Sequence, residues 1–336
     1  MKILIHCNQP FVFAHGGLQS QIEQTKGALD RIGVEVEFLR WWDEHQKGDV
    51  FHYFGRMPIL LLRGAKQKGM KVIFSDLMGG TGARSRNKLI LQRWGTRIFQ
   101  QLLPGMVVAH FNWESYRLAD ACLALTAWEA HLMTYIFGAP EEKVHVVPNG
   151  VEEVFFKHER AARGKWLVCT ATINAVKRVV EIAEAAVLAQ TPVWIIGRAY
   201  SDADPYAQKI FSLARRSPEF IRYEGAIPDR ERLAQIYRDA RGFVLLSAWE
   251  SLSLSALEAA ACECPLLLSD LPWARSTFGE HACYCPVSPP RCTAGHLRAF
   301  YDQAPSLKPP PKPLTWTEVA RQLKAIYEQV CSSPHS

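Results

Sequence analysis

The sequence predicts an α/β protein built from two doubly wound parallel sheets. Short apolar segments of strand length alternate with segments of helical periodicity in both halves of the chain. A chain of 336 residues is long for one hydrophobic core and suits two domains. The turn signal Pro148-Asn149-Gly150 follows the last strand of the first half. We therefore expect one domain over residues 1–150 and another over residues 151–305.

The composition excludes several classes of protein. With 48% hydrophobic and 21% charged residues, the chain resembles an ordinary globular protein, and it has no apolar stretch of membrane-spanning length. It opens on a strand, so we expect no secretory signal. Nine cysteines without the spacing of a disulfide framework favour the cytoplasm. The pairs Cys262/Cys264 and Cys283/Cys285 fit strand-edge thiols better than metal ligands.

Eleven segments have strand character. Those of the first half are 1–7, 34–40, 49–55, 71–76, 120–126 and 143–148. Those of the second half are 166–172, 192–197, 220–225, 243–248 and 265–269. Parallel sheets bind ligands beyond the carboxyl ends of their strands, so His52, Asp76 and the loop 78–86 are expected on the ligand side. A packed, hydrogen-bonded side chain is the simpler interpretation of His52 and of His110.

A glycine pair, Gly16-Gly17, lies after His15 where the first helix is expected to begin. Glycine lets the backbone approach a ligand closely, and a helix start favours a phosphate group. A flexible loop is the alternative interpretation. Neither half opens on a GxGxxG sequence, so a hydride-transferring dinucleotide enzyme is disfavoured.

Residues 63–97 are strongly basic. A segment with helical periodicity, 88–103, begins within this range. It places four apolar residues on one stripe: Ile90, Trp94, Ile98 and Leu102. A basic amphipathic helix can dock on an anionic membrane or on a lipid-phosphate acceptor. The alternative is a helix that packs this stripe on the sheet. No recognised nucleic-acid-binding motif accompanies the charge.

The second half continues with helices expected from Lys177, near 205–216, from Asp229 and from Ser253. Lys177 and Arg178 lie at a helix start after a strand, a place that suits cations neutralising a diphosphate, although surface charge is an equal alternative. Residues 306–313 form a proline-rich linker. We expect a final helix over 314–331 to pack back toward the first domain.

Residues 243–268 predict a strand, a loop, a helix and a strand. Glu250 lies in the loop and Glu258 in the helix. The unpaired N–H groups of a helix start attract anions, and carboxylates accept hydrogen bonds from sugar and ribose hydroxyls. The segment therefore predicts a nucleotide-sugar site, with a solvated helix residue as the alternative for Glu258.

Several of these segments together resemble the family 4 glycosyltransferases of the GT-B fold. Gly16-Gly17 matches the family's glycine pair, residues 144–155 match its interdomain stretch, and Lys177 matches its lysine. Residues 223–251 match the block that leads to the first glutamate of an E-x7-E pair, here Glu250 and Glu258. The resemblance implies two Rossmann-like domains that face each other across a cleft, and retaining transfer from a nucleotide-sugar without a metal or other cofactor.

The resemblance also implies roles for individual residues. Glu250, Lys177 and Asp76 are the catalytic candidates, with Glu250 holding the donor sugar and Lys177 the diphosphate. Glu258 would hold the ribose. The donor-binding candidates are Gly16, Gly17, Arg178, Arg198, Ile227, Ser253, Leu254 and Glu258.

Some positions depart from the family pattern. The arginine about six residues before the lysine is replaced by Ala171-Thr172, for which Arg178 is a substitute, and Asp76 or Leu77 replaces a histidine. Ser253 replaces a loop glycine, and Gly197-Arg198-Ala199 replaces a G-x-G. These departures leave two alternatives open: a non-catalytic GT-B subunit that binds a nucleotide or a partner, and a nucleotide-sugar epimerase.

The sequence as a whole thus predicts a cytoplasmic hexosyltransferase-like enzyme. Residues 63–103 offer a peripheral contact with the inner face of the membrane as one interpretation. The enzyme would move a sugar from a UDP- or GDP-sugar to a glycan or lipid-linked acceptor. We expect no nucleic-acid partner.

Overall fold

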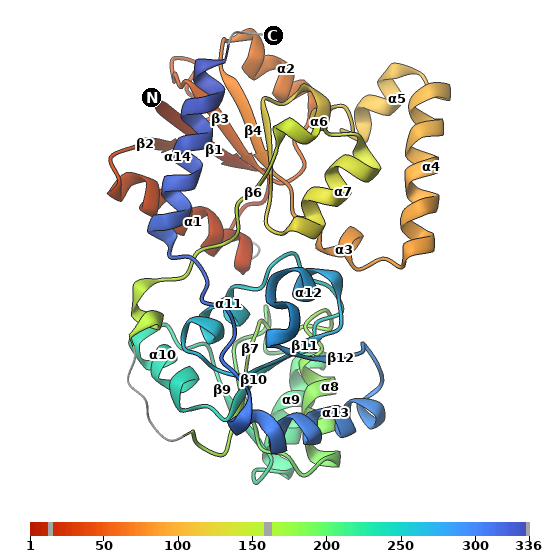
Figure 1. Ribbon diagram of the computed structural model, residues 1–336, viewed down its shortest axis with the longest axis vertical. Helices are drawn as coiled ribbons and strands as arrows, with labels where there is room; N and C mark the ends of the chain where they lie inside the picture. The colour runs from red at the N-terminus through yellow and green to blue at the C-terminus, as the bar shows by residue number, and fades with distance from the viewer. Residues whose placement is uncertain (13–15, 158–162, 334–336) are drawn as a thin grey trace. The chain divides into compact units, whose positions relative to one another are not determined.

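A computed structural model describes residues 1–12, 16–157 and 163–333 and divides into two compact units (Figure 1). The first unit comprises Met1–Asn149 and Trp316–Ser336, and the second comprises Gly150–Thr315. Each unit holds one six-stranded parallel sheet flanked by helices, which confirms the predicted α/β fold. His15 and residues 158–162 lie outside the described residues.

The sheet of the first unit has the strand order β2-β1-β3-β4-β5-β6, and each strand lies within a predicted segment. Its strands are β1 (Lys2–Cys7), β2 (Glu35–Phe38), β3 (Val50–Phe54), β4 (Lys71–Ser75), β5 (Ala121–Ala124) and β6 (Val144–Val146). The strand order reverses between β1 and β3, which is a topological switch point.

The helices of the first unit connect these strands, and one helix returns from the end of the chain. They are α1 (Gly17–Arg31), α2 (Ile59–Gln67), α3 (Gly79–Gly82), α4 (Arg86–Leu102), α5 (Gly105–His110), α6 (Ser115–Leu118), α7 (Ala127–Phe137) and α14 (Trp316–Ser332). The stretch 78–86, predicted to be a loop, contains the short helix α3. His110 ends α5 with an exposed side chain, so its packed interpretation is wrong.

Helix α14 packs against α1 and closes one face of the first sheet (Figure 1). Its Tyr327 hydroxyl lies 2.7 Å from Nδ1 of His52, and Nε2 of His52 lies 2.9 Å from Oγ of Ser75. His52 is therefore a packed residue in the middle of β3, and its expected place on the ligand side is wrong. Burial lowers the pKa of His52 to about 3, so the ring is neutral.

The second unit has the strand order β12-β11-β10-β7-β8-β9, the order of a dinucleotide-binding fold. Its strands are β7 (Leu167–Thr170), β8 (Val193–Ile196), β9 (Ile221–Glu224), β10 (Gly242–Leu245), β11 (Leu266–Ser269) and β12 (Cys283–Cys285). The first five confirm the predicted segments. The edge strand β12 was not predicted as a strand.

Helices connect the strands of the second unit, with further short 3-10 turns at Gly279–His281 and Ala304–Ser306. The helices are α8 (Val179–Leu188), α9 (Pro205–Arg216), α10 (Arg230–Asp239), α11 (Leu254–Ala261), α12 (Pro272–Phe278), α13 (Pro290–Gln303) and the 3-10 turn Glu153–Phe156. Helix α8 begins at Val179 rather than at the predicted Lys177. Asp229 and Ser253 cap α10 and α11 by accepting backbone N–H groups, as their sequence positions predicted.

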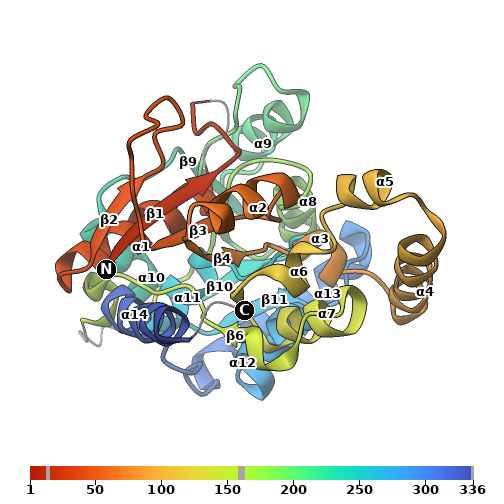
Figure 2. The ribbon, with the colours of Figure 1, turned by 90° about the horizontal axis from the view of Figure 1, so that it is seen from above.

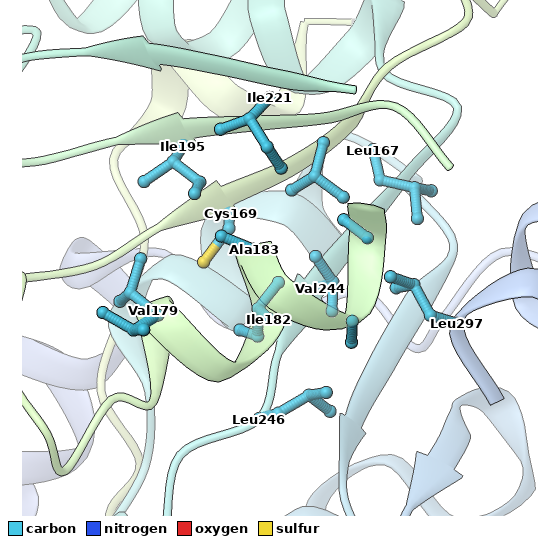
Figure 3. Close-up of a cluster of buried hydrophobic side chains, with 14 of the residues drawn as sticks. Leu167, Cys169, Val179, Ile182, Ala183, Ile195, Ile221, Val244, Leu246 and Leu297 are labelled. Atoms are coloured by element: carbon cyan, nitrogen blue, oxygen red, sulfur yellow. The ribbon is translucent and has the colours of Figure 1, made fainter. Parts of the chain in front are cut away.

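The core of the second unit forms where α8 and α13 cover one face of the sheet (Figure 3). Ile182 and Ala183 of α8 and Leu297 of α13 are fully buried. They belong to one cluster with strand residues that include Leu167, Cys169, Ile195, Ile221 and Val244. This packing holds β7 and β10 side by side in the middle of the sheet, where Phe243 pairs with Val168.

The neutral state of His52 predicts a pH-dependent stability of the first unit. The histidine takes up a proton below about pH 6.5 in the unfolded chain but only near pH 3 in the folded chain. The unfolded state binds more protons in that window, so stability falls with decreasing pH by at most about 1.4 kcal/mol per pH unit. Hydrogen exchange of the β3 and β4 amides, measured at about pH 7 and pH 5, reports this loss.

Between about pH 7 and pH 5, the free energy of unfolding of the first unit should fall by about 2 kcal/mol less in His52→Gln than in the wild type. His45→Gln, at an exposed histidine in the loop after β2, is the control. An unchanged pH slope in His52→Gln would show that other groups cause the acid sensitivity.

Candidate active site

The loops that follow β7 and β10 meet at the carboxyl end of the second sheet, at its topological switch point. The Ala248 N–H donates to the Val176 carbonyl over 2.7 Å and ties the two loops together. Lys177 from one loop then forms an ion pair with Oε1 of Glu250 from the other. The structure therefore brings together Lys177 and Glu250, two of the three predicted catalytic residues, whereas the third, Asp76, lies in the first unit.

The Glu250 carboxylate is 10% exposed and is held at one oxygen only. Ser247 Oγ donates to the same Oε1 over 2.8 Å. Oε2 accepts no hydrogen bond from the residues that the structure describes. The carboxylate therefore has one oxygen that can accept a hydrogen bond from a ligand hydroxyl.

Arg178 follows Lys177 in the left-handed region, with a φ of 53°. Its guanidinium donates through Nη2 to the Ser288 carbonyl, in the loop between β12 and α13. Nη1 is buried and has no partner among the described residues. Arg178 thus positions the Ser288 loop and retains one unpaired donor, so its predicted contact with a donor diphosphate stays a prediction.

Helix α11 begins beside this site and carries the second predicted glutamate. Ser253 caps it by accepting the Ala256 N–H over 3.3 Å, which leaves the N–H groups of Leu254 and Ser255 in the first turn without a helical partner. Glu258 is 12% exposed, so the solvated interpretation is wrong. Burial raises the pKa of its carboxyl group, and the nearby Arg230 guanidinium opposes the rise.

Arg230 is a site residue that the sequence analysis missed. It donates to Oε1 of Glu258 through Nη2 and to Glu152 through Nε, the latter over 2.8 Å. Its guanidinium carbon lies 4.7 Å from the centre of the Phe155 ring. Tyr237, also missed, donates to Oε2 of Glu258 over 3.4 Å. Nothing in the spacing of Arg230 or Tyr237 from Glu258 marks either residue as its partner.

The loop after β8 comes close to the loop after β7. Gly197 has a φ of 151°, and a Cβ atom on it would lie 1.9 Å from the Ala171 carbonyl oxygen. A glycine is therefore required at this position. Arg198 next to it is exposed, whereas Ile227 after β9 is buried. Their predicted contacts with a donor stay predictions.

The remaining predicted residues lie in the first unit. Gly16 precedes α1 and Gly17 is its first residue, as the sequence predicted for a helix start. Asp76 is buried after β4, where it accepts hydrogen bonds from Arg56 and from the Tyr116 hydroxyl. The Asp76 carboxylate is therefore already paired, and its predicted catalytic role stays a prediction.

Within residues 1–12, 16–157 and 163–333, no cluster of three or more His, Cys, Asp or Glu side chains could hold a metal ion. Cys262 and Cys264 are buried thiols, and burial raises the pKa of each to about 12. Over the same residues, no helix is both long and apolar enough to cross a bilayer.

Comparison with known proteins finds similarity in sequence and in fold. A sequence profile described as "Glycosyl transferases group 1" matches residues 164–303, which lie within the second unit. No curated protein matches the chain by sequence. Among solved structures, Anabaena HepE in complex with UDP and glucose aligns with a TM-score of 0.65 at 13% identity, covering 98% of each chain.

Two further solved structures have a similar fold. Sucrose-phosphate synthase from Thermosynechococcus elongatus has a TM-score of 0.68 at 15% identity, again over 98% of each chain. The pneumococcal O-GlcNAc transferase GtfA, in complex with UDP and GlcNAc, has a TM-score of 0.61 at 13% identity. That match covers 84% of this chain but 57% of the longer one. The chain has the GT-B fold.

The buried pair of Glu258 and Arg230 predicts a stability effect that can be measured without substrate. Arg230→Met leaves the Glu258 carboxylate buried with fewer donors and should destabilise the second unit by about 2 kcal/mol. Loss of the guanidinium raises the pKa of Glu258 further, so the folded state retains a proton that the unfolded state releases. The destabilisation should therefore grow as the pH rises from about 5 to about 8.

Glu258→Gln in the Arg230→Met background removes the buried charge and should restore much of the stability. Hydrogen exchange of the α11 amides across a urea series measures both variants. Arg232→Met, at a more exposed arginine on the same helix, is the control. An Arg230→Met variant with a pH-independent loss would mean that Glu258 is uncharged in the wild type.

Proposed function

We propose that the protein is a glycosyltransferase that moves a sugar from a nucleotide-sugar donor to a glycan or lipid-linked acceptor. The observation that carries this proposal is the contact of Lys177 with Glu250 at the switch point of the second sheet. The profile match over residues 164–303 and the GT-B fold support it. UDP is the nucleotide named for HepE and GtfA, and it is the first donor nucleotide to test.

In this proposal the residues of the second unit divide the donor between them. Oε2 of Glu250 accepts hydrogen bonds from the sugar hydroxyls, and Glu258 accepts them from the ribose. The first-turn N–H groups of α11, beginning at Leu254, bind the diphosphate. Lys177 lies beside Glu250 and neutralises the charge that grows on the leaving phosphate as the glycosidic bond breaks.

The finer parts of the proposal concern mechanism. We infer a retaining, metal-independent transfer of the family 4 type, in which the lysine and helix N–H groups do the work that a divalent ion performs in other transferases. Arg178, with its unpaired Nη1, is the residue that compensates for the arginine replaced by Ala171-Thr172.

Substitution of the central pair tests the proposal. Lys177→Met and Glu250→Gln should each lower kcat by about 100-fold or more, because each removes charge stabilisation or sugar alignment in the transition state. The assay is transfer, or donor hydrolysis, with UDP-glucose and UDP-GlcNAc. Lys157→Met and Glu231→Gln alter another Lys–Glu pair of the same unit and should leave the rate unchanged. If Lys177→Met and Glu250→Gln both keep the wild-type rate, the assignment of these two residues to the active site is wrong.

Nucleotide binding separates the donor site from the chemistry. Glu258→Ala should weaken UDP binding about 10- to 100-fold, since it removes hydrogen bonds to a charged acceptor. Calorimetry with UDP, GDP and ADP measures this directly. Tight UDP binding with neither transfer nor hydrolysis over an acceptor panel would favour the non-catalytic GT-B subunit. Conversion of the donor without an acceptor would favour the epimerase.

Metal removal gives an independent outcome. Because the donor diphosphate is assigned to Lys177 and to helix N–H groups, EDTA should leave both UDP affinity and the transfer rate unchanged. A loss of transfer in EDTA that Mg²⁺ or Mn²⁺ restores would contradict this part of the mechanism, even if the sugar-binding assignments stand.

A further inference from the structure

Helix α4 of the first unit packs with one face and leaves the opposite, apolar face exposed. Leu89 and Thr96 are buried on the side that contacts α7, and Arg93 lies with its guanidinium carbon 4.2 Å from the centre of the Tyr135 ring. Figures 1 and 2 both show α4 with α5 at the outer edge of the unit, beyond α7. The sheet therefore does not cover the other face of α4.

That other face carries large hydrophobic side chains. Leu91, Trp94, Ile98 and Leu102 recur at helical spacing and are 73%, 63%, 44% and 76% exposed. At 100° per residue they lie opposite Leu89 and Thr96. The alternative that this stripe packs on the sheet is wrong. We call the four residues, together with Ile90 and Phe99, the α4 apolar face.

Exposure of this face to water is unfavourable. Burial of a single leucine-sized side chain is worth about 1.5–3 kcal/mol, and contiguous exposed apolar patches mark interaction sites. Trp94 in the middle of the face has the amphipathic ring that favours membrane interfaces. Val107 of α5, 44% exposed, adds to the apolar surface beside the C-terminal end of α4.

The charges around the face identify what covers it. No Asp or Glu occurs between Asp76 and Glu114. Arg86, Lys88 and Arg97 of α4 are exposed, and none forms an ion pair within the described part of the chain. The partner must therefore tolerate apolar insertion and supply negative charge.

A second copy of this chain does not meet that requirement. A two-fold contact through α4 would bring the same basic residues of both copies together, and like charges across an interface are costly. A bilayer with anionic lipid meets both requirements, because acyl chains accept the apolar face and the headgroups attract lysine and arginine.

We propose that α4 docks the protein on anionic membrane surfaces. The helix lies in the plane of the interface, with Leu91, Trp94 and Ile98 at the acyl boundary and Arg86 and Arg97 at the headgroups. The docking goes beyond the proposed sugar transfer and does not depend on it, since its residues all lie in the first unit.

Vesicle sedimentation tests the proposal with the full chain. The wild type should bind vesicles of phosphatidylcholine mixed with phosphatidylglycerol and should not bind phosphatidylcholine alone. The triple variant Arg86→Gln/Lys88→Gln/Arg97→Gln should lower the partition coefficient by about 100-fold, from about 1 kcal/mol per charge. Lys209→Gln/Arg215→Gln/Arg216→Gln removes the same charge from exposed positions of α9 and should retain binding.

The apolar part has its own variant pair. Leu91→Ser/Trp94→Ser/Ile98→Ser should lower partitioning by at least about 10-fold at unchanged net charge. Trp41→Ser is the control, because Trp41 is 81% exposed in the loop after β2. This variant should leave partitioning into the vesicles unchanged. Circular dichroism checks that each variant of the full chain is folded, and UDP calorimetry reports on the second unit separately.

Three results would overturn the proposal. They are absence of wild-type binding to the anionic vesicles, equal binding by the α4 variants and their controls, and a concentration-dependent dimer that the serine variant abolishes. The last of these, measured by analytical ultracentrifugation without lipid, would assign the α4 apolar face to self-association instead. Loss of UDP binding with intact vesicle binding would count against the proposed transferase alone.

Discussion

The candidate site depends on the parallel pairing of β7 with β10 in the middle of the second sheet. This pairing joins two strands that are about seventy residues apart in the sequence. Because the strands are parallel, the loops that follow them begin at the same edge of the sheet. Lys177 and Glu250 meet only because of this pairing, and the hydrogen bond from Ala248 to Val176 fixes the distance between their loops. The core around α8 is thus part of the site, since it holds the two strands in register.

A second constraint is the burial of acidic groups. Glu258 lies inside the unit, and a buried carboxylate is stable only with donors around it. Arg230 and Tyr237 supply them, and Glu152 shares the arginine. In the first unit, Arg56 and the Tyr116 hydroxyl donate hydrogen bonds to the buried carboxylate of Asp76 in the same way. The open oxygen of Glu250 differs from these, and that difference is why we assign it to the donor sugar.

The sequence predicted the sheets well because periodicity and strand length are local signals. It also singled out Lys177 and Glu250, because both follow strands and match the motifs of a known family, although α8 begins two residues after Lys177. It could not predict which donors surround Glu258, because Arg230 reaches it from another helix. His52 shows the same limit. Its position in β3 was clear, but its partner Tyr327 comes from α14, 275 residues later.

Helix α4 shows why amphipathicity alone does not decide what a helix contacts. An apolar stripe is equally compatible with packing on a sheet and with docking on a membrane. Tertiary packing decides between these two possibilities. Helix α4 contacts α7 on the side of Leu89 and Thr96, and Trp94 on the other side stays exposed to solvent. Arg86 and Arg97 lie between the buried side and the exposed stripe and Lys88 lies on the opposite flank, all three exposed, so charge and apolar area can act on the same partner. That coincidence favours an anionic bilayer over any uncharged apolar surface.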